Sequence, residues 1–366
     1  MKPAVYVAGT SRHCGKTSVA LGLFAALRER GHRVAYMKPV GQRTVEYKGL
    51  TVDEDVALIH EVFDIHTCPS SANPVTIPSG FTHQFLTGRR SPTELIDEIL
   101  NAYEMVTEDA DMVVVEGTGH AGVGAVIGVS NAEVARLLGC TAIVVAGGGI
   151  GRPIDEFELS RSVFEEKNVP ILGMICNKVY PEKIAKIESP VRLWLQNHGY
   201  KLLGLFPYEP VMSELSMAQI ADDMEAEVLA GHNCLARRIS RSIVGAGRSD
   251  SVIQEFSDGT LMITPGDRED LVLAAVCWDQ IHGGGSDRGI GVCMASCVRL
   301  SAEVLRVADA SGIPIICVPG TICDVSAKIR SWVGSILSTE EAKIDTAKRL
   351  VQRHLDLDAV TELLTG

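Results

Sequence analysis

The residues best suited to chemistry in this sequence lie in one stretch near the N-terminus, GTSRHCGKTS, which runs from Gly9 to Ser18. An apolar run precedes the stretch, and an amphipathic segment follows it. In a strand–loop–helix arrangement of this kind, backbone N–H groups surround an anion and the helix N-terminus faces it. Lys16 would then reach the β- and γ-phosphates, and the Thr17 hydroxyl would bind Mg²⁺. The stretch predicts a nucleotide site.

The spacing of this loop differs from the usual G-x-x-x-x-G-K-[ST] pattern, because five residues separate Gly9 from Gly15. A turn into an ordinary helix is the alternative interpretation. The flanks favour a phosphate loop, since apolar residues at helical spacing follow it and Gly31 closes that segment. We therefore expect the loop and the start of the helix to bind the nucleotide, through Gly9, Thr10, His13, Cys14, Gly15, Lys16, Thr17 and Ser18.

Two further polar residues stand at the ends of expected strands. Lys38 follows residues 33–37, which places it at the carboxyl edge of a sheet, beside the loop; a solvated lysine before a turn is the alternative. Glu116 ends a buried apolar run within residues 111–119. An acid on a rigid strand beside a phosphate loop can hold Mg²⁺ and its waters, or it can bond only to backbone amides. We interpret Lys16 and Lys38 as the catalytic cations and Glu116 as a metal-binding acid.

Three consecutive acids, Asp53, Glu54 and Asp55, lie at the start of an expected helix over residues 51–63. They could stabilise the helix dipole, or one of them could hold Mg²⁺. Residues 69–92 are rich in Ser, Pro, Thr and Gly, which is typical of a lid or substrate loop. Asn177 and Lys178 follow an expected strand over residues 170–176, where P-loop proteins often contact the base. No Asp follows two residues later, so guanine is not indicated.

The elements that position these residues alternate along the chain. Further expected helices cover residues 91–107, 131–138 and 155–167, and a further strand covers residues 141–146. This alternation predicts an α/β fold with a P-loop NTPase-type, doubly wound parallel sheet. A proline-flanked boundary near residue 207 separates this first region from a second region in which expected strands and helices again alternate. We expect a nucleotide-binding domain over residues 1–210 and a smaller α/β domain over residues 211–366, the amphipathic tail included.

Composition limits the class of protein. With 366 residues, 46% hydrophobic and 22% charged, the chain suits two globular domains. The 46 acidic against 34 basic residues give a net charge of −12, which disfavours nucleic acid as a partner. No apolar run is long enough to span a membrane, and the N-terminus leads directly into a strand, so we expect a cytoplasmic protein. The ten cysteines are scattered, which favours reduced thiols, Cys317 among them, over a metal site.

The motifs of the first half together resemble dethiobiotin synthetase and its P-loop relatives, through GTSRHCGKT, MKPVG, DEDVALI, ANP and VVVEGTG. The resemblance implies ATP and Mg²⁺ as cofactors, Asp55 and Glu116 in support of the metal, Lys38 facing substrate and phosphate, and Asn177 near adenine. Ser11, Arg12 and His13 replace acids that those synthetases carry inside the loop. GTGHAGVGAVIGVSNAEVARLLG and GGGIGRPIDEFELS are more similar to the N-terminal region of long phosphotransacetylases.

The second half resembles a DRTGG domain, of whose name motif only Asp267 and Arg268 remain. Such domains are regulatory or form oligomers, so the resemblance implies a homodimer or a higher homo-oligomer. Asp267 and Arg268 could belong to a ligand cleft or form a structural ion pair. We expect no acetyltransferase domain and no glutaminase of the kind that cobyrinic acid diamide synthases append. Two functions follow: a MgATP-binding regulatory or sensing protein with a small-molecule ligand, or an ATP-dependent ligase that phosphorylates a carboxylate or carbamate.

Overall fold

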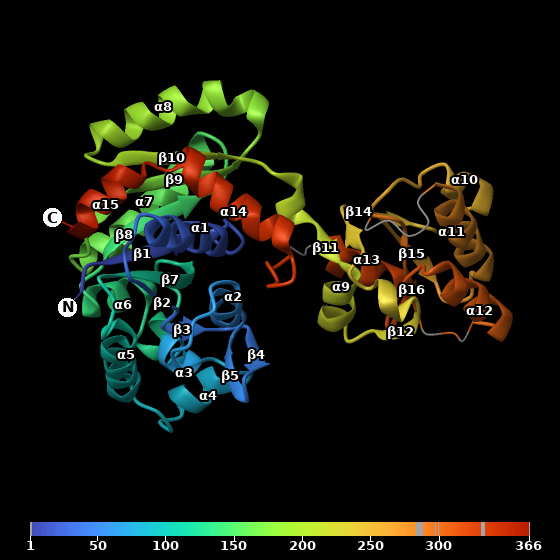
Figure 1. Ribbon diagram of the computed structural model, residues 1–366, viewed down its shortest axis with the longest axis horizontal. Helices are drawn as coiled ribbons and strands as arrows, with labels where there is room; N and C mark the ends of the chain where they lie inside the picture. The colour runs from blue at the N-terminus through green and yellow to red at the C-terminus, as the bar shows by residue number, and fades with distance from the viewer. Residues whose placement is uncertain (1, 283–287, 297, 299, 331–333, 366) are drawn as a thin grey trace. The chain divides into compact units, whose positions relative to one another are not determined.

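The computed structural model describes residues 2–282, 288–296, 298, 300–330 and 334–365 (Figure 1). Contacts within the chain divide it into two compact units. The first unit comprises Met1–Glu209 and Ile336–Gly366, and the second comprises Pro210–Ser335. No helix of the described residues is long and apolar enough to cross a membrane.

A six-stranded parallel sheet forms the centre of the first unit, in the order β10-β9-β8-β1-β7-β2. The strands are β1 (Ala4–Gly9), β2 (Val34–Met37), β7 (Met112–His120), β8 (Thr141–Ala146), β9 (Ile171–Val179) and β10 (Lys201–Pro207). Two small sheets lie beside it, β3 (Val40–Gly41) with β6 (Val75–Thr76), and β4 (Thr44–Tyr47) with β5 (Leu50–Asp53). The expected α/β parallel sheet is confirmed.

Helices cover the two faces of this sheet. They are α1 (Lys16–Glu29), α2 (Glu54–Val62), α3 (Pro69–Ala72), α4 (Phe81–Leu86), α5 (Pro92–Thr107), α6 (Asn131–Leu137), α7 (Gly151–Glu166), α8 (Ile184–Asn197), α14 (Glu341–His354) and α15 (Leu357–Thr365). Figure 1 shows α1 and α14 side by side, with α5 and α6 across the sheet from them. Because both faces are covered, β1 and β7 are buried along almost their whole length, as their apolar sequences predict.

The second unit contains a smaller mixed sheet in the order β12-β17-β16-β15-β14, with only β12 antiparallel to its neighbour. Its strands are β12 (Glu227–Ala230), β14 (Arg241–Val244), β15 (Thr260–Pro265), β16 (Gly291–Ala295) and β17 (Ile315–Val318), and β11 (Leu215–Ser216) pairs with β13 (Arg238–Ile239). Alternate residues of β15 face opposite cores, Met262 one and Leu261 and Ile263 the other. The helices are α9 (Met217–Met224), α10 (Ser249–Ile253), α11 (Glu269–His282), α12 (Ala302–Ser311) and α13 (Ile322–Arg330).

The C-terminal tail differs from its expected place in a second domain over residues 211–366. Residues 336–366 belong to the first unit, where α14 packs on α1. Gly22 of α1 allows this close approach, because a Cβ there would lie 2.5 Å from the carbonyl oxygen of Ala347 and from Val351 Cγ2. The apolar face of α14 therefore completes the core around the P-loop helix, and the second unit is an insertion between β10 and α14.

Three local expectations also change. Residues 50–53 form β5 rather than the first turn of a helix, and the Asp53 side chain caps α2 by accepting from the Asp55 N–H. The expected loop over residues 69–92 contains α3, β6 and α4. Cys317 is disulfide-bonded rather than reduced, whereas Cys14, Cys140, Cys176 and Cys293 are buried free thiols.

Candidate nucleotide site

Two glycines shape the loop between β1 and α1. A Cβ on Gly9 would lie 2.5 Å from Cys14 Sγ, so the loop can fold back only on a glycine. Gly15 precedes α1 with a φ of 99°, in the left-handed region, and a Cβ there would lie 2.0 Å from Asn177 Nδ2. Both positions therefore exclude a side chain. The longer five-residue gap closes into a tight loop that ends at the start of α1.

Neighbouring strands hold the loop from two sides. The Thr10 N–H donates to the Val145 carbonyl of β8 (2.9 Å), and its hydroxyl donates to Glu156 Oε2 of α7 (2.8 Å). From β9, Asn177 Nδ2 donates to the Cys14 carbonyl (2.9 Å) and Lys178 Nζ donates to the His13 carbonyl (2.9 Å). Asn177, which the resemblance places near adenine, contacts the loop backbone in this structure.

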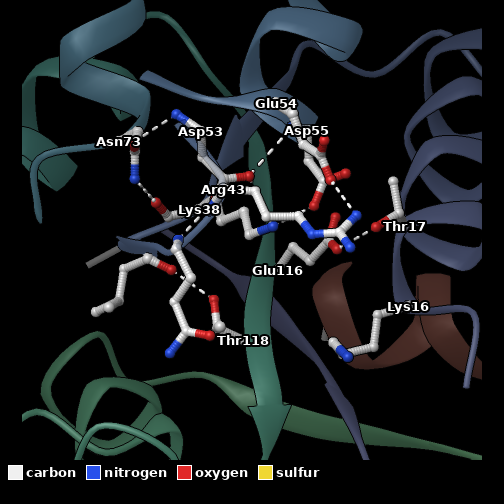
Figure 2. Close-up of polar contacts among 12 residues, drawn as sticks. Lys16, Thr17, Lys38, Arg43, Asp53, Glu54, Asp55, Asn73, Glu116 and Thr118 are labelled. Atoms are coloured by element: carbon white, nitrogen blue, oxygen red, sulfur yellow. Dashed lines mark hydrogen bonds and ion pairs between the residues drawn. The ribbon is translucent and has the colours of Figure 1, made fainter. Parts of the chain in front are cut away.

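Lys16 and Thr17 begin α1. The Lys16 side chain is largely buried, and its Nζ lies 3.4 Å from the Ser11 carbonyl oxygen. The Thr17 hydroxyl donates to Glu116 Oε1 (2.7 Å) (Figure 2). The Tyr36 hydroxyl donates to Glu116 Oε2 (2.8 Å). Glu116 is 1% exposed, near the middle of β7, and pairs in register with Val7 of β1. The structure thus brings Thr17 and Glu116 together.

The carboxyl group of Glu116 lies in an unusual electrostatic environment. Burial, and then the negative charge of Asp55, raise its pKa to about 7, although Lys38 and the two hydroxyl donors favour the charged form. Burial and the charge of Glu116 also raise the pKa of Tyr36, so its phenol stays protonated as a donor. Glu116 can therefore exchange a proton near neutral pH, as residues in functional sites often do.

Lys38 forms a buried ion cluster with two acids. Its Nζ lies 2.8 Å from Asp53 Oδ1 and also contacts Asp55 Oδ2. Although burial opposes the charge, Asp55, Glu116 and Asp53 hold the pKa of Lys38 above its ordinary value. Asn73 connects the cluster to the backbone, since its Nδ2 donates to the Lys38 carbonyl and its Oδ1 accepts from the Asp53 N–H (both 2.8 Å). Figure 2 shows the cluster beside Glu116.

Positive charge gathers around the phosphate loop. Burial and the charges of Arg43, Lys178, Lys16 and Arg12 lower the pKa of His13. The chain as a whole carries a net charge of −12, so this concentration of cations is local. Arg12 Nη2 also donates to Gln42 Oε1 (3.1 Å), which ties the phosphate loop to the segment after β3. The region favours an anion.

The Mg²⁺ that the resemblance implies would find suitable oxygen donors. Within the described residues no group of three or more His, Cys, Asp or Glu side chains could hold a metal ion alone. Mg²⁺ usually takes one or two protein oxygens and completes its shell with waters and substrate phosphates. The Thr17 hydroxyl and the Glu116 carboxylate fit that donor set, whereas Asp55 contacts Lys38.

Two contributors to the site escaped sequence reasoning, namely Tyr36 and Glu156. The sequence singled out Asn73 and Lys178, but not their contacts with the Lys38 and His13 carbonyls, and it did not reveal Asp53 as a partner of Lys38. Tyr36 and Lys38 lie two residues apart around the end of β2, so their side chains share a face, a signal that could have identified Tyr36. Asn73 and Glu156 come from distant segments. In the second unit, Arg268 pairs with Asp270 (2.8 Å), not with Asp267, and bonds the Gly247 carbonyl (2.8 Å), which is a structural role.

A parallel α/β sheet, a phosphate loop opening a helix and an acid on the adjacent strand define a protein of the P-loop nucleotide-binding class. The chain belongs to the AAA_26 family, an AAA domain whose family model matches residues 3–216, and a DRTGG domain matches residues 219–332. The resemblance to the N-terminal half of phosphotransacetylases is confirmed.

The curated relatives are phosphate acetyltransferases. The chain is 28% identical over 366 residues to that of Pseudomonas putida, covering 96% of this chain and 50% of the relative. It is 23% identical to that of Haemophilus influenzae, covering 100% of this chain and 53% of the relative. The chain therefore spans about half the length of the curated relatives it matches.

Similar solved structures include septum-site proteins. The Pyrococcus horikoshii MinD complexed with Mg-ADP is 16% identical, with a TM-score of 0.36, covering 58% of this chain and 84% of that chain. The MinC:MinD complex of Aquifex aeolicus gives 11% identity and a TM-score of 0.37, covering 57% of this chain and 83% of that chain.

Proposed function

We propose that the protein binds MgATP at the phosphate loop and acts as a regulatory or sensing protein, in which the nucleotide is coupled to a small-molecule ligand. The observation that carries the proposal is the Thr17–Glu116 hydrogen bond beside Lys16, within a cluster of cations around His13. Lys16 and the loop N–H groups would bind the phosphates, while Thr17 and Glu116 would hold Mg²⁺. The metal would neutralise phosphate charge.

The environment of Lys38 favours sensing over phosphoryl transfer. A catalytic lysine must offer net positive charge to a transferring phosphate. Here Asp53 and Asp55 neutralise Lys38, which is 7% exposed. Lys38 therefore organises the segment after β2 instead of serving as a free cation. We further propose that the protein works as a homo-oligomer, as the DRTGG domain implies.

Titration calorimetry with MgATP tests nucleotide binding. We expect the wild type to bind, and Lys16→Ala to weaken binding at least tenfold, because Lys16 contributes a charge-assisted contact. Lys186→Ala, which removes an exposed lysine of α8, is the matched control and should bind as the wild type does. Equal affinities in wild type and Lys16→Ala would contradict the proposal.

The ATP-dependent ligase remains the second candidate, because Lys38, Glu116 and Asp55 share one electrostatic cluster beside the loop. Mg²⁺-dependent ADP release, measured against a panel of carboxylates and amines with bicarbonate, separates the two functions. Turnover that one compound stimulates and Lys16→Ala abolishes would establish a ligase. Binding of MgATP without stimulated turnover supports the sensor.

A further inference from the structure

Two aromatic side chains follow strands of the first unit at the edge of the sheet where the phosphate loop lies. Tyr180 comes directly after β9, and Tyr208 comes directly after β10. The six strands are parallel and β9 pairs with β10, so both tyrosines leave the sheet at the same carboxyl edge as the loop after β1. The Tyr208 N–H donates to the Val179 carbonyl (2.8 Å), which holds the two strand ends together.

The rings of these two tyrosines form an exposed pair. Their centroids lie 5.4 Å apart with an interplanar angle of 46°, a separation at which aromatic rings are in contact. Tyr180 is 51% exposed, so a core does not cover its ring. Lys183, an exposed lysine, has its Nζ 5.2 Å from the centroid of Tyr180, so a face of this ring is accessible to solvated groups. The Tyr180–Tyr208 pair therefore offers ring surface to a ligand.

The end of β9 connects this pair to the phosphate loop. Asn177 and Lys178 each donate a hydrogen bond of 2.9 Å to a carbonyl of the loop. Tyr180 follows Lys178 by two residues, a span of at most about 7 Å. Gly148 packs against the same segment, because a Cβ on it would lie 2.9 Å from the Lys178 carbonyl oxygen. Tyr180 is thus held close to the loop that would bind the phosphates.

The two positions expected to bind the edge of a base do not offer a group for it. Asn177 is 5% exposed, its Nδ2 donates to the loop, and its Oδ1 accepts from the Lys178 N–H (2.8 Å). Tyr180 stands two residues after Lys178, where an Asp would have indicated guanine. A carboxylate selects one base by accepting hydrogen bonds from its edge, whereas an aromatic ring stacks on the face that every base has.

We propose that Tyr180 and Tyr208 form a stacking platform for the base of the bound nucleotide, and that the site binds ATP and GTP with similar affinity. The phosphates would lie at the loop and Lys16, and the purine would stack on the exposed ring of Tyr180 beside Tyr208. Stacking favours a nucleotide over a free phosphate chain without selecting between purines. The proposal rests on the proposed nucleotide binding, for which it names the residues that hold the base and the class of nucleotide.

Calorimetry of the full chain with MgATP and with inorganic triphosphate and Mg²⁺ tests the platform. In Tyr180→Ala we expect ATP to bind about tenfold more weakly and triphosphate to bind as it does to the wild type, because only ATP carries a base. Tyr180→Phe keeps the ring and should bind ATP as the wild type does. The matched control is Tyr47→Ala on β4, since Tyr47 also has a lysine over its ring, Lys48 at 5.1 Å. Equal affinity for ATP in wild type and Tyr180→Ala, or equal losses for ATP and triphosphate, would overturn the platform.

A second titration compares MgGTP with MgATP. We expect the two dissociation constants of the wild type to agree within about fivefold, and Tyr180→Ala to weaken both nucleotides by the same factor. A larger preference for either purine would overturn recognition by the ring face. Triphosphate separates this proposal from the proposed function. If neither ATP nor triphosphate binds the wild type, the proposed function fails; if both bind and Tyr180→Ala leaves the ratio of their affinities unchanged, only the platform fails.

Discussion

Glu116 occupies a buried position between two hydroxyl donors from different elements, Thr17 on α1 and Tyr36 on β2. A carboxyl group in this position must either lose its charge or have that charge compensated by neighbours. The positive charge of Lys38 partly compensates the negative charge of Glu116, whereas the negative charge of Asp55 disfavours it. This balance places the proton equilibrium of Glu116 close to neutral pH, where binding of a metal or a phosphate would shift it.

The raised pKa of Glu116 predicts a pH-dependent stability. The folded protein holds the proton up to about pH 7, whereas the unfolded chain releases it near 4.5. The contribution of Glu116 to the free energy of unfolding is therefore fully present below about pH 4.5 and is lost as the pH rises through about 7. This loss lowers the free energy of unfolding by a few kcal/mol. Glu116→Gln should flatten the fall in unfolding free energy between pH 5 and pH 8, measured by urea denaturation. Glu188→Gln, which changes a largely solvated side chain of α8, is the control, and an unchanged slope in Glu116→Gln would refute the prediction.

Lys38→Met should be strongly destabilising, because it leaves Asp53 and Asp55 buried without their cation. Breaking a buried ion pair on one side costs about 3–5 kcal/mol. Arg33→Met is the matched control, since Arg33 pairs with Asp111 in an exposed position, where a pair contributes about 1 kcal/mol or less. Urea denaturation at pH 7 measures both. A loss below about 1 kcal/mol in Lys38→Met would show that the cluster is not structural.

Asn177→Ala should weaken binding of ATP and of inorganic triphosphate by a similar factor, because Asn177 holds the Cys14 carbonyl and contacts Gly15. A loss of about threefold to tenfold corresponds to one hydrogen bond. Calorimetry with ATP, GTP and triphosphate measures the effect. If Asn177→Ala instead altered only the preference for ATP over GTP, the side chain would contact the base, as the family resemblance implies.

The residues that a local pattern identified were those next to a glycine or at the end of an apolar run. Gly15, Lys16 and Thr17 belong to a contiguous motif, and Glu116 directly follows a recognisable apolar run, although β7 continues beyond it to His120. Asn73 and Glu156 could not be found this way, since their roles depend on contacts with residues far away in sequence. The position of Lys38 after an expected strand identified it as a site residue. Its ion pair with Asp53 could not be predicted, because that contact depends on how β5 folds beside Lys38.

At the scale of elements, the packing of α14 on α1 is the contact that most affects the nucleotide site. Every residue of α1 from Val19 to Leu27 is buried, although a helix on the face of a sheet usually has a solvated side. The helix α14 covers that side. This explains why the first helix of the chain shows so weak an alternation of apolar and polar residues.

Gly22→Ala should destabilise the protein, even though alanine is the better helix former. The added methyl group would lie 2.5 Å from the Ala347 carbonyl oxygen and from Val351, so α14 would have to move, at a cost of about 1–3 kcal/mol. Gly151→Ala at the start of α7, where a Cβ meets nothing within 4 Å, is the control and should be neutral or slightly stabilising. Thermal unfolding distinguishes the two. A stabilised Gly22→Ala would mean that the two helices are not in close contact.

Long, strongly patterned elements were predictable, and short ones were not. Residues 141–146 form β8 as expected, and Ser91 begins α5 with the capping box that its sequence indicates. The start of α2 shifted because Val52 and Asp53 pair with β4, a tertiary contact that overrides local helix propensity. The short α3, β6 and α4 lie in a segment whose Ser, Pro and Gly content is typical of loops.

The whole molecule is a P-loop unit interrupted by the unit Pro210–Ser335. The amphipathic pattern of residues 341–351 predicted a helix, but it could not indicate which core the helix completes. An isolated fragment 1–209 should therefore fail to fold stably, because α1 would expose the surface that Ile344, Ala347, Leu350 and Val351 cover. Burying Ile344, Leu350 and Val351 contributes about 1.5–3 kcal/mol each, which together approaches the stability of a typical domain.

Circular dichroism of fragment 1–209 tests this prediction, with and without residues 336–366 joined through a flexible linker. We expect cooperative thermal unfolding only when the tail is present. A control in which the tail carries Val351→Asp should behave as the fragment without it. Cooperative unfolding of 1–209 alone would show that the tail is dispensable.

The insertion also determines when the protein can fold during its synthesis. Most domains fold as soon as their own sequence has left the ribosome, and synthesis proceeds at about 5–20 residues per second. Here the phosphate loop is translated before the inserted unit, whereas α14, the helix that covers α1, is translated only after the whole of it. The apolar face of α1 therefore stays exposed in the nascent P-loop unit while residues 210–335 are translated. We expect a chaperone that recognises apolar segments of nascent chains to bind this exposed face of α1.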